Sequence, residues 1–107
     1  MIYKILLPAE WAAFEADGVF AGSPLDLADG FVHLSTDAQV HRTAERYFAG
    51  EPALVVLSVD ASAFGDALQW EANAHGTFPH LYAPLPMTAV TKVRRVSDIS
   101  DLLGMTD

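Results

Sequence analysis

The chain has 107 residues, of which 51% are hydrophobic and 19% are charged. This composition indicates one folded domain over residues 1–107 and excludes intrinsic disorder, because so apolar a chain can offset the entropy lost on ordering. The absence of cysteine excludes a disulfide scaffold, a thiol nucleophile and a thiolate metal site.

The formal net charge is −8, with only six lysines and arginines. So few basic residues argue against a nucleic-acid partner but leave a small anionic ligand open. The longest stretch without a charged residue, 72–91, contains three prolines and two histidines and does not resemble a membrane span. The apolar run at the N-terminus is too short for a signal peptide. We therefore expect a cytoplasmic protein without a membrane partner, either a monomer or a homodimer.

The first half of the chain alternates strands and helices. The predicted elements are a buried strand over Ile2–Leu7, a helix over Pro8–Asp17, a loop over Val19–Gly30, a strand over Phe31–Ser35, and a helix that begins near Thr36 and ends at Gly50. Pro8 suits a first helical turn and Gly18 a helix end. Residues 36–39 match a capping box, and the helix after them carries one apolar stripe made of Val40, Ala44, Tyr47 and Phe48.

The second half is mostly extended. The predicted elements are a central strand over Leu54–Val59, a helical turn over Ala61–Gly65, a strand over Leu68–Glu71, a turn over Asn73–Gly76, an extended segment over Phe78–Tyr82, a turn between Pro84 and Pro86, a strand over Val90–Val96, and a short closing helix over Ser97–Leu103 whose Ile99, Leu102 and Leu103 pack inward. About five strands and two main helices in irregular order favour an α+β fold over a wound parallel sheet.

Lys4 is the first residue that does not fit its surroundings, because it interrupts an apolar strand. The two-residue period of a strand places it with Ile2 and Leu6 on one face and Tyr3 with Ile5 on the other. If both faces are buried, the ammonium group needs a partner or an opening onto a cleft. The alternative is an edge strand whose lysine reaches water.

A polar cluster is predicted where the second strand ends. His33 and Ser35 share a face of the strand with Phe31, and Thr36 follows at the start of a helix. His33 could bind a ribose or act as an acid or base, and Ser35 could hold a phosphate or an amide. The alternatives are a half-buried histidine with ordinary partners and a threonine that only caps the helix, which is the favoured interpretation of Thr36.

A second cluster combines Trp70 and Glu71 with the segment that follows. Phe78, His80 and Tyr82 face one way in an extended segment, and two aromatic rings beside an imidazole could stack on a flat ring. Glu71 beside a tryptophan could have a raised pKa suited to acid–base chemistry, or it could pair with Lys4 or Arg94. Equally, His80 and Tyr82 could simply find backbone partners at the edge of the core.

No metal site is predicted. The four histidines, at positions 33, 41, 75 and 80, show none of the helical spacings used for metal ligation, and no glycine-rich phosphate loop occurs.

Four segments together resemble the domain-of-unknown-function family 952. They are Ile2-Tyr3-Lys4-Ile5, Gly30-Phe31-Val32-His33-Leu34-Ser35-Thr36 with Gln39, Trp70-Glu71, and Phe78-Pro79-His80-Leu81-Tyr82-Ala83-Pro84-Leu85. The resemblance covers residues 2 to 96. It implies a fold like that of the ADP-ribosyltransferases, in which split antiparallel sheets of short strands enclose a small NAD-binding cleft.

Two of these segments also resemble transferase motifs. Tyr3-Lys4-Ile5-Leu6 is similar to the Tyr-His-Gly-Thr strand of those enzymes, and Val32-His33-Leu34-Ser35 is similar to the Val-His-Leu-Ser strand of RNA 2′-phosphotransferases. In such enzymes the first strand holds a ribose, the second lines the nicotinamide pocket, and a late acidic residue stabilises the oxocarbenium-like state. Glu71 is the counterpart of that acid by chain order. The departure is that Lys4 stands in place of the histidine, and Ile5-Leu6 in place of the small Gly-Thr pair.

The resemblance implies a cleft that binds a small nucleotide such as NAD or an ADP-ribosyl compound, with transferase or glycohydrolase activity. The expected catalytic residues are His33 and Glu71, and the expected ligand-binding residues are Lys4, Ser35, Thr36, Trp70, Phe78, His80 and Tyr82. The alternative is a ligand-binding or protein-interaction module that keeps the fold without the chemistry.

Overall fold

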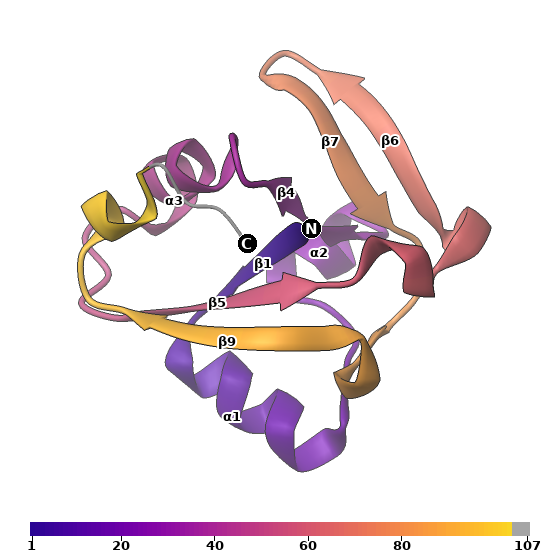
Figure 1. Ribbon diagram of the computed structural model, residues 1–107, viewed down its shortest axis with the longest axis horizontal. Helices are drawn as coiled ribbons and strands as arrows, with labels where there is room; N and C mark the ends of the chain where they lie inside the picture. The colour runs from indigo at the N-terminus through magenta and orange to yellow at the C-terminus, as the bar shows by residue number, and fades with distance from the viewer. Residues whose placement is uncertain (104–107) are drawn as a thin grey trace.

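A computed structural model describes residues 1–103 of the chain. It is a mixed α+β structure with antiparallel sheets (Figure 1). The strands are β1 (Ile2–Leu6), β2 (Val19–Phe20), β3 (Val32–His33), β4 (Ser35–Thr36), β5 (Leu54–Val59), β6 (Leu68–Asn73), β7 (Gly76–Leu81), β8 (Leu85–Pro86) and β9 (Val90–Val96). The α-helices are α1 (Pro8–Asp17), α2 (Pro24–Asp29) and α3 (Val40–Phe48), and short 3₁₀ turns cover Ala61–Ala63, Gly65–Ala67, Met87–Ala89 and Ile99–Leu102.

The strands form a four-stranded, a three-stranded and a two-stranded sheet. Their orders are β4-β1-β5-β9, β3-β7-β6 and β2-β8, and every pairing is antiparallel. The β6–β7 hairpin extends away from the four-stranded sheet in Figure 1. No helix within residues 1–103 is long and apolar enough to cross a membrane.

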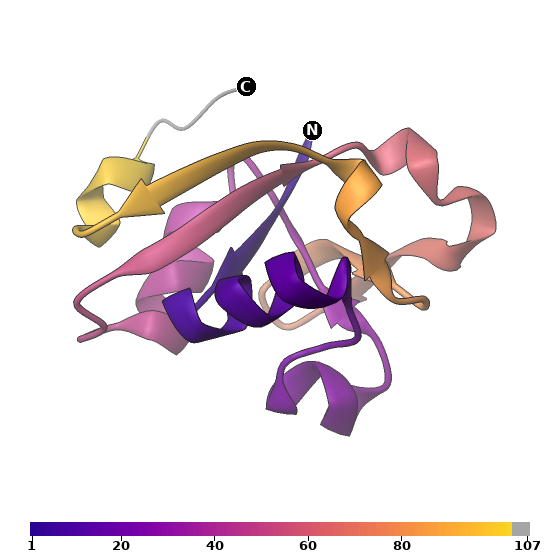
Figure 2. The same ribbon diagram turned by 90° about the horizontal axis from the view of Figure 1, so that it is seen from below.

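Within the four-stranded sheet, β1 and β5 are buried on both faces. Ile2 and Leu6 of β1 pack into one core with α1, and Tyr3 and Ile5 pack into a second core with α3. Figure 2 shows α1 running along its side of this sheet. The alternation predicted for β1 is therefore confirmed, and it places Lys4 on the side of Ile2 and Leu6. The edge-strand alternative is wrong, because β1 lies between β4 and β5.

Several predicted elements match the structure closely. The helix Pro8–Asp17 has the predicted bounds and ends on Gly18 in the left-handed conformation, at φ 74°. The strands Leu54–Val59 and Val90–Val96 also have the predicted bounds, and β5 lies in the middle of its sheet. The predicted turn over Asn73–Gly76 is the tip of the β6–β7 hairpin.

The loop predicted over Val19–Gly30 is wrong. This segment contains β2 and the short helix α2, whose N-terminus is capped by Ser23 and whose end is formed by Gly30 at φ 87°. The six-residue helix is too short for a periodic apolar pattern, so its capping residues are its main signal.

The predicted strand over Phe31–Ser35 is two strands. β3 pairs with β7 of the three-stranded sheet, whereas β4 pairs with β1 of the four-stranded sheet. The chain therefore crosses from one sheet to the other around Leu34, which is buried. This crossing brings the two sheets together at the place where the candidate site lies.

Smaller differences concern the ends of helices. The helix predicted to begin near Thr36 begins at Val40, because the backbone of Thr36 pairs with Ile2 in the sheet. Thr36 is thus not its cap, and Tyr47 is 56% exposed instead of joining the buried stripe. The closing helix is a 3₁₀ turn over Ile99–Leu102, which leaves Leu103 exposed.

Candidate functional site

A buried ion pair occupies the centre of the molecule. The Lys4 ammonium lies 2.9 and 3.2 Å from the two carboxylate oxygens of Asp26 and donates to the backbone oxygen of His33 at 3.1 Å. Lys4 is 5% exposed and Asp26 2%. Lys4 therefore has the buried partner that its apolar strand requires, and the ammonium also lies 5.6 Å from the ring of Phe20.

Asp26 uses both of its carboxylate oxygens to hold its neighbours together. Oδ2 accepts from the backbone N–H of Ser23 at 2.9 Å, and Oδ1 accepts from the backbone N–H of His33 at 3.0 Å and from its Nδ1 at 2.6 Å. Burial opposes ionisation, but the hydrogen bonds from His33 and the charge of Lys4 outweigh it and hold the pKa of Asp26 well below its ordinary value. Burial lowers the pKa of Lys4, and the attraction of Asp26 opposes that shift. Asp26 is an anchor that joins β1, α2 and β3.

Asp26 was not among the predicted site residues, because it lies in the segment predicted as a loop. Two signals could have identified it. Ser23-Pro24-Leu25-Asp26 has the capping-box spacing that positions an acid at a helix N-terminus. A lysine in a strand buried on both faces also requires an acid from elsewhere in the chain.

His33 lies between two carboxylates. Its Nδ1 faces Asp26 and its Nε2 lies 2.9 Å from Oδ2 of Asp29. Both ring nitrogens can donate at once only when the imidazole is protonated. The two carboxylates thus fix the orientation of the His33 ring.

An aromatic cluster extends from His33 across β3 and β7. The ring of Phe31 stacks on His80 with centroids 3.9 Å apart, and it lies 4.5 Å from His33 and 5.3 Å from Tyr82. Phe31 thus lies at the centre of this aromatic cluster. The sequence pattern had instead predicted that Phe78 and Tyr82 flank His80 directly.

Glu71 pairs with residues of this cluster and not with Lys4 or Arg94. Its Oε1 accepts from the hydroxyl of Tyr82 at 2.6 Å and from Nδ1 of His80 at 2.8 Å. These two bonds lower the pKa of Glu71, the bond from Tyr82 contributing most, and the same contact raises the pKa of Tyr82. The raised pKa considered for Glu71 is therefore wrong. His80 contacts Glu71 through Nδ1 and itself lines the adjoining pocket.

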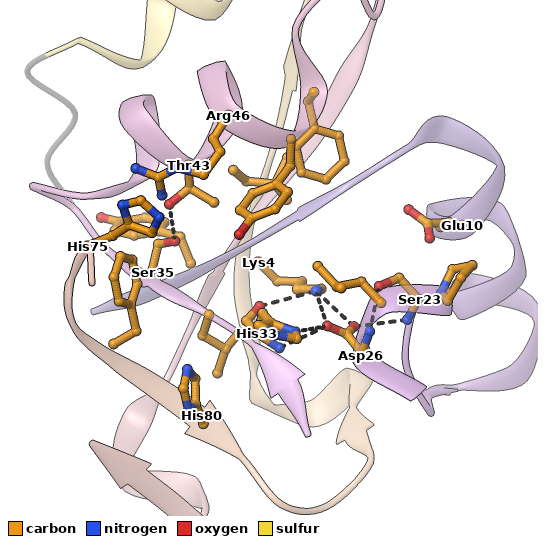
Figure 3. A pocket seen from close by; sticks show the side chains of 18 of the residues that line it. Lys4, Glu10, Ser23, Asp26, His33, Ser35, Thr43, Arg46, His75 and His80 are labelled. Atoms are coloured by element: carbon orange, nitrogen blue, oxygen red, sulfur yellow. Dashed lines mark hydrogen bonds and ion pairs between the residues drawn. The ribbon is translucent and has the colours of Figure 1, made fainter. Parts of the chain in front are cut away.

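The pocket lies between the two sheets and has a volume of about 280 Å³ (Figure 3). Five of the expected site residues line it, namely Lys4, His33, Ser35, Phe78 and His80. Its apolar wall comes from Tyr3, Ile5, Leu7, Leu34 and Phe48. This volume lies just below the usual range of ligand pockets, about 300–1,000 Å³, and an apolar wall with a few converging polar groups is typical of them.

The other expected site residues lie outside the pocket lining. Glu71 and Tyr82 reach it only through His80, and Thr36 lies in β4 beyond it. Trp70 pairs with Pro79 in the hairpin, is 52% exposed and takes no part in the cluster. Across residues 1–103 no group of three or more potential ligands is arranged to hold a metal ion.

The fold and this site define a small α+β protein with a pocket between two antiparallel sheets. The family model described as protein of unknown function (DUF952) matches residues 5–93, and the chain belongs to that family. A search of the curated proteins finds no match.

Among solved structures, the chain is similar to the crystal structure of protein CC0527 from Caulobacter crescentus, with 46% identity over 97% of this chain and 98% of that one, and a TM-score of 0.88. The crystal structure of a double mutant of CC0527 gives a TM-score of 0.87 at the same identity and coverage. The solution NMR structure of CC0527 matches with 50% identity over 90% of this chain and 82% of that one, and a TM-score of 0.75.

Proposed function

We propose that this protein binds a small nucleotide, such as NAD or an ADP-ribosyl compound, in the pocket between its two sheets. The observation that carries the proposal is the pocket itself, where the charged Lys4–Asp26–His33 network meets an apolar, partly aromatic wall. Such a combination suits a ligand with a flat ring and a polar sugar.

An ADP-ribosyltransferase-like fold belongs to the same proposal. Support for it comes from the two antiparallel sheets of short strands, which are joined where the chain crosses from β3 to β4. The strands that carry Lys4 and His33 border the pocket, in keeping with the resemblance to the ribose-binding and nicotinamide-lining strands of those enzymes.

The flat ring of the ligand has a matching surface on Phe78. This side chain is half-buried, lines the pocket and belongs to the same strand as His80. A ring stacked on it would place the sugar toward His33 and Lys4. Asp26 already neutralises the Lys4 ammonium, so the ligand does not need a negative group at this position.

Hydrolysis of the bond between the ribose and the nicotinamide ring is the activity that the side chains favour. Glu71 holds His80 through Nδ1, so Nε2 of His80 can take a proton from a water molecule. The water oxygen then bonds to the ribose carbon, and the carbon–nitrogen bond breaks with its electron pair leaving on nicotinamide. The products are ADP-ribose, nicotinamide and the proton held by His80, which passes to solvent.

Thermal unfolding with and without ligand tests the binding. A ligand at ten times its Kd stabilises the folded state by about 1.4 kcal/mol, which raises the Tm of a domain of this size by several degrees. We expect such a rise with NAD or ADP-ribose for the natural sequence and for the control Val93→Ala, on the exposed side of β9. Phe78→Ala should reduce the rise. No shift at millimolar ligand would overturn the proposal.

Release of nicotinamide from NAD tests the chemistry separately. His33→Ala and Glu71→Gln should lose turnover while their circular dichroism spectra stay folded. Ligand-dependent stabilisation without nicotinamide release would support the binding module that keeps the fold without the chemistry.

A further inference from the structure

One end of the pocket is cationic and rich in hydroxyl groups. Ser35 of β4, Thr43 and Arg46 of α3, and His75 at the tip of the β6–β7 hairpin line it together. Figure 3 shows these side chains on one side of Lys4, with Asp26 and Glu10 on the other. The acidic groups of the pocket are thus separated from this end.

Arg46 brings a positive charge to this end of the pocket. Within residues 1–103 no carboxylate forms an ion pair with it, and its neighbour Glu45 lies 3.5 Å from His41 instead. Asp26, the buried acid of the pocket, is already paired with Lys4. The guanidinium lies 5.9 Å from the ring centre of Tyr47, which also lines the pocket. The charge stays available for a ligand at the pocket mouth.

Hydroxyl groups lie beside this charge. Ser35 donates to the hydroxyl oxygen of Thr43 at 3.1 Å, and Ser35 is 3% exposed. The hydroxyl hydrogen of Thr43 has no acceptor among the described residues and can be donated to a ligand. Thr43 and Arg46 are three residues apart on α3, a spacing that places them on one face of the helix.

The hairpin tip is tied to the helix that carries these groups. Gln39, which precedes α3, donates through Nε2 to the backbone oxygen of Thr77 at 2.7 Å. In the adjoining turn, the backbone N–H of His75 donates to the side chain of Asn73 at 2.7 Å. These bonds hold His75 over the end of the pocket opposite Asp26.

We infer that this end of the pocket binds a phosphate group of the ligand, so that the protein takes phosphorylated nucleotides in preference to nucleosides. The planar guanidinium of Arg46 matches two phosphate oxygens, and Thr43 and His75 add donors for the third. The inference rests on the proposed function, because the rest of the nucleotide would occupy the pocket as described above.

Calorimetric titration with matched pairs of ligands tests the inference. The pairs are nicotinamide riboside against nicotinamide mononucleotide, and adenosine against ADP, so that the members of each pair differ in phosphate alone. The natural protein should bind the phosphorylated member at least tenfold more tightly. Arg46→Gln should lose about tenfold for that member and leave the nucleoside unchanged, because the charge-assisted hydrogen bonds from the guanidinium to the phosphate are removed.

Arg42→Gln is the matched control, since Arg42 lies on α3 one turn earlier, is exposed and does not line the pocket. It should bind every ligand as the natural protein does. Equal losses in the two variants would overturn the assignment to Arg46. Equal affinity for nucleoside and nucleotide would overturn the phosphate site while the proposed function stands. No binding of any of the four ligands would overturn both.

Discussion

Replacing Lys4 by methionine tests the buried network at its centre. Methionine keeps most of the apolar stem of lysine, so the change removes the ammonium and its three hydrogen bonds and opens little space. Asp26, 2% exposed, then keeps its contact with His33 and loses its partner Lys4. Breaking a buried pair on one side costs about 3–5 kcal/mol, and the remaining contact with His33 places the expected loss near the lower value.

A loss of about 3 kcal/mol lowers the Tm by roughly 12–24 °C and the urea midpoint by about 1 M or more. Urea unfolding followed by circular dichroism measures both the midpoint and its slope. Lys92→Met is the control, because Lys92 is exposed on β9, and it should change stability by less than about 0.5 kcal/mol.

The double variant Lys4→Met with Asp26→Asn separates the ion pair from its surroundings. It removes both charges, so it should be more stable than Lys4→Met alone even though it carries one more substitution. A loss below about 1 kcal/mol for Lys4→Met, or additive losses in the double variant, would refute the argument that the pair anchors the site.

Three further predictions follow from the same contacts. Because the folded pKa of Asp26 lies below the ordinary unfolded value of about 3.9, its contribution to stability is complete well above that pH and falls by up to about 1.4 kcal/mol per pH unit below it. Urea unfolding of the natural protein and of Asp26→Asn should therefore differ most above about pH 5, and the difference should shrink steadily as the pH falls below about 4. Tyr82→Phe should raise the pKa of Glu71 toward its ordinary value in an NMR titration of the carboxyl carbons, and an unchanged pKa would show that the hydroxyl does not hold that carboxylate. Gly22→Ala should destabilise the fold more than Gly18→Ala by thermal unfolding, because both glycines have positive φ but only at Gly22 would the added Cβ lie 2.9 Å from the Cβ of Asp26; equal losses would contradict this.

Much of the sheet could be predicted from short-range patterns. The alternation in β1 correctly assigned its residues to two cores, and the uninterrupted apolar run of β5 correctly indicated a central strand. These predictions succeed because burial of one strand depends on its own side-chain period.

The partner of Lys4 could not be predicted in the same way. The anomaly of a lysine in an apolar strand indicated that a partner was needed, but Asp26 is 22 residues away and lies in a helix too short to show a period. Its place depends on how α2 packs against β3, which is a tertiary property.

The environment of Glu71 shows the same limit. Its neighbour Trp70 suggested an apolar surrounding and a raised pKa, but neighbours in a strand point to opposite faces. Glu71 faces His80 and Tyr82 across the hairpin, and their hydrogen bonds lower its pKa instead. Likewise, the split of the predicted second strand at Leu34 depends on two different pairing partners, β7 and β1, which no pattern within the segment specifies.

The most direct test of the proposal that the pocket binds a nucleotide is a titration with ADP-ribose followed by two-dimensional ¹H–¹⁵N NMR. The proposal predicts saturable shifts of backbone amides around the pocket, at His33, Ser35, Thr43 and Phe78, with the amide of Val93 on β9 unmoved. Shifts confined to residues outside the pocket, or none at millimolar ADP-ribose, would contradict it.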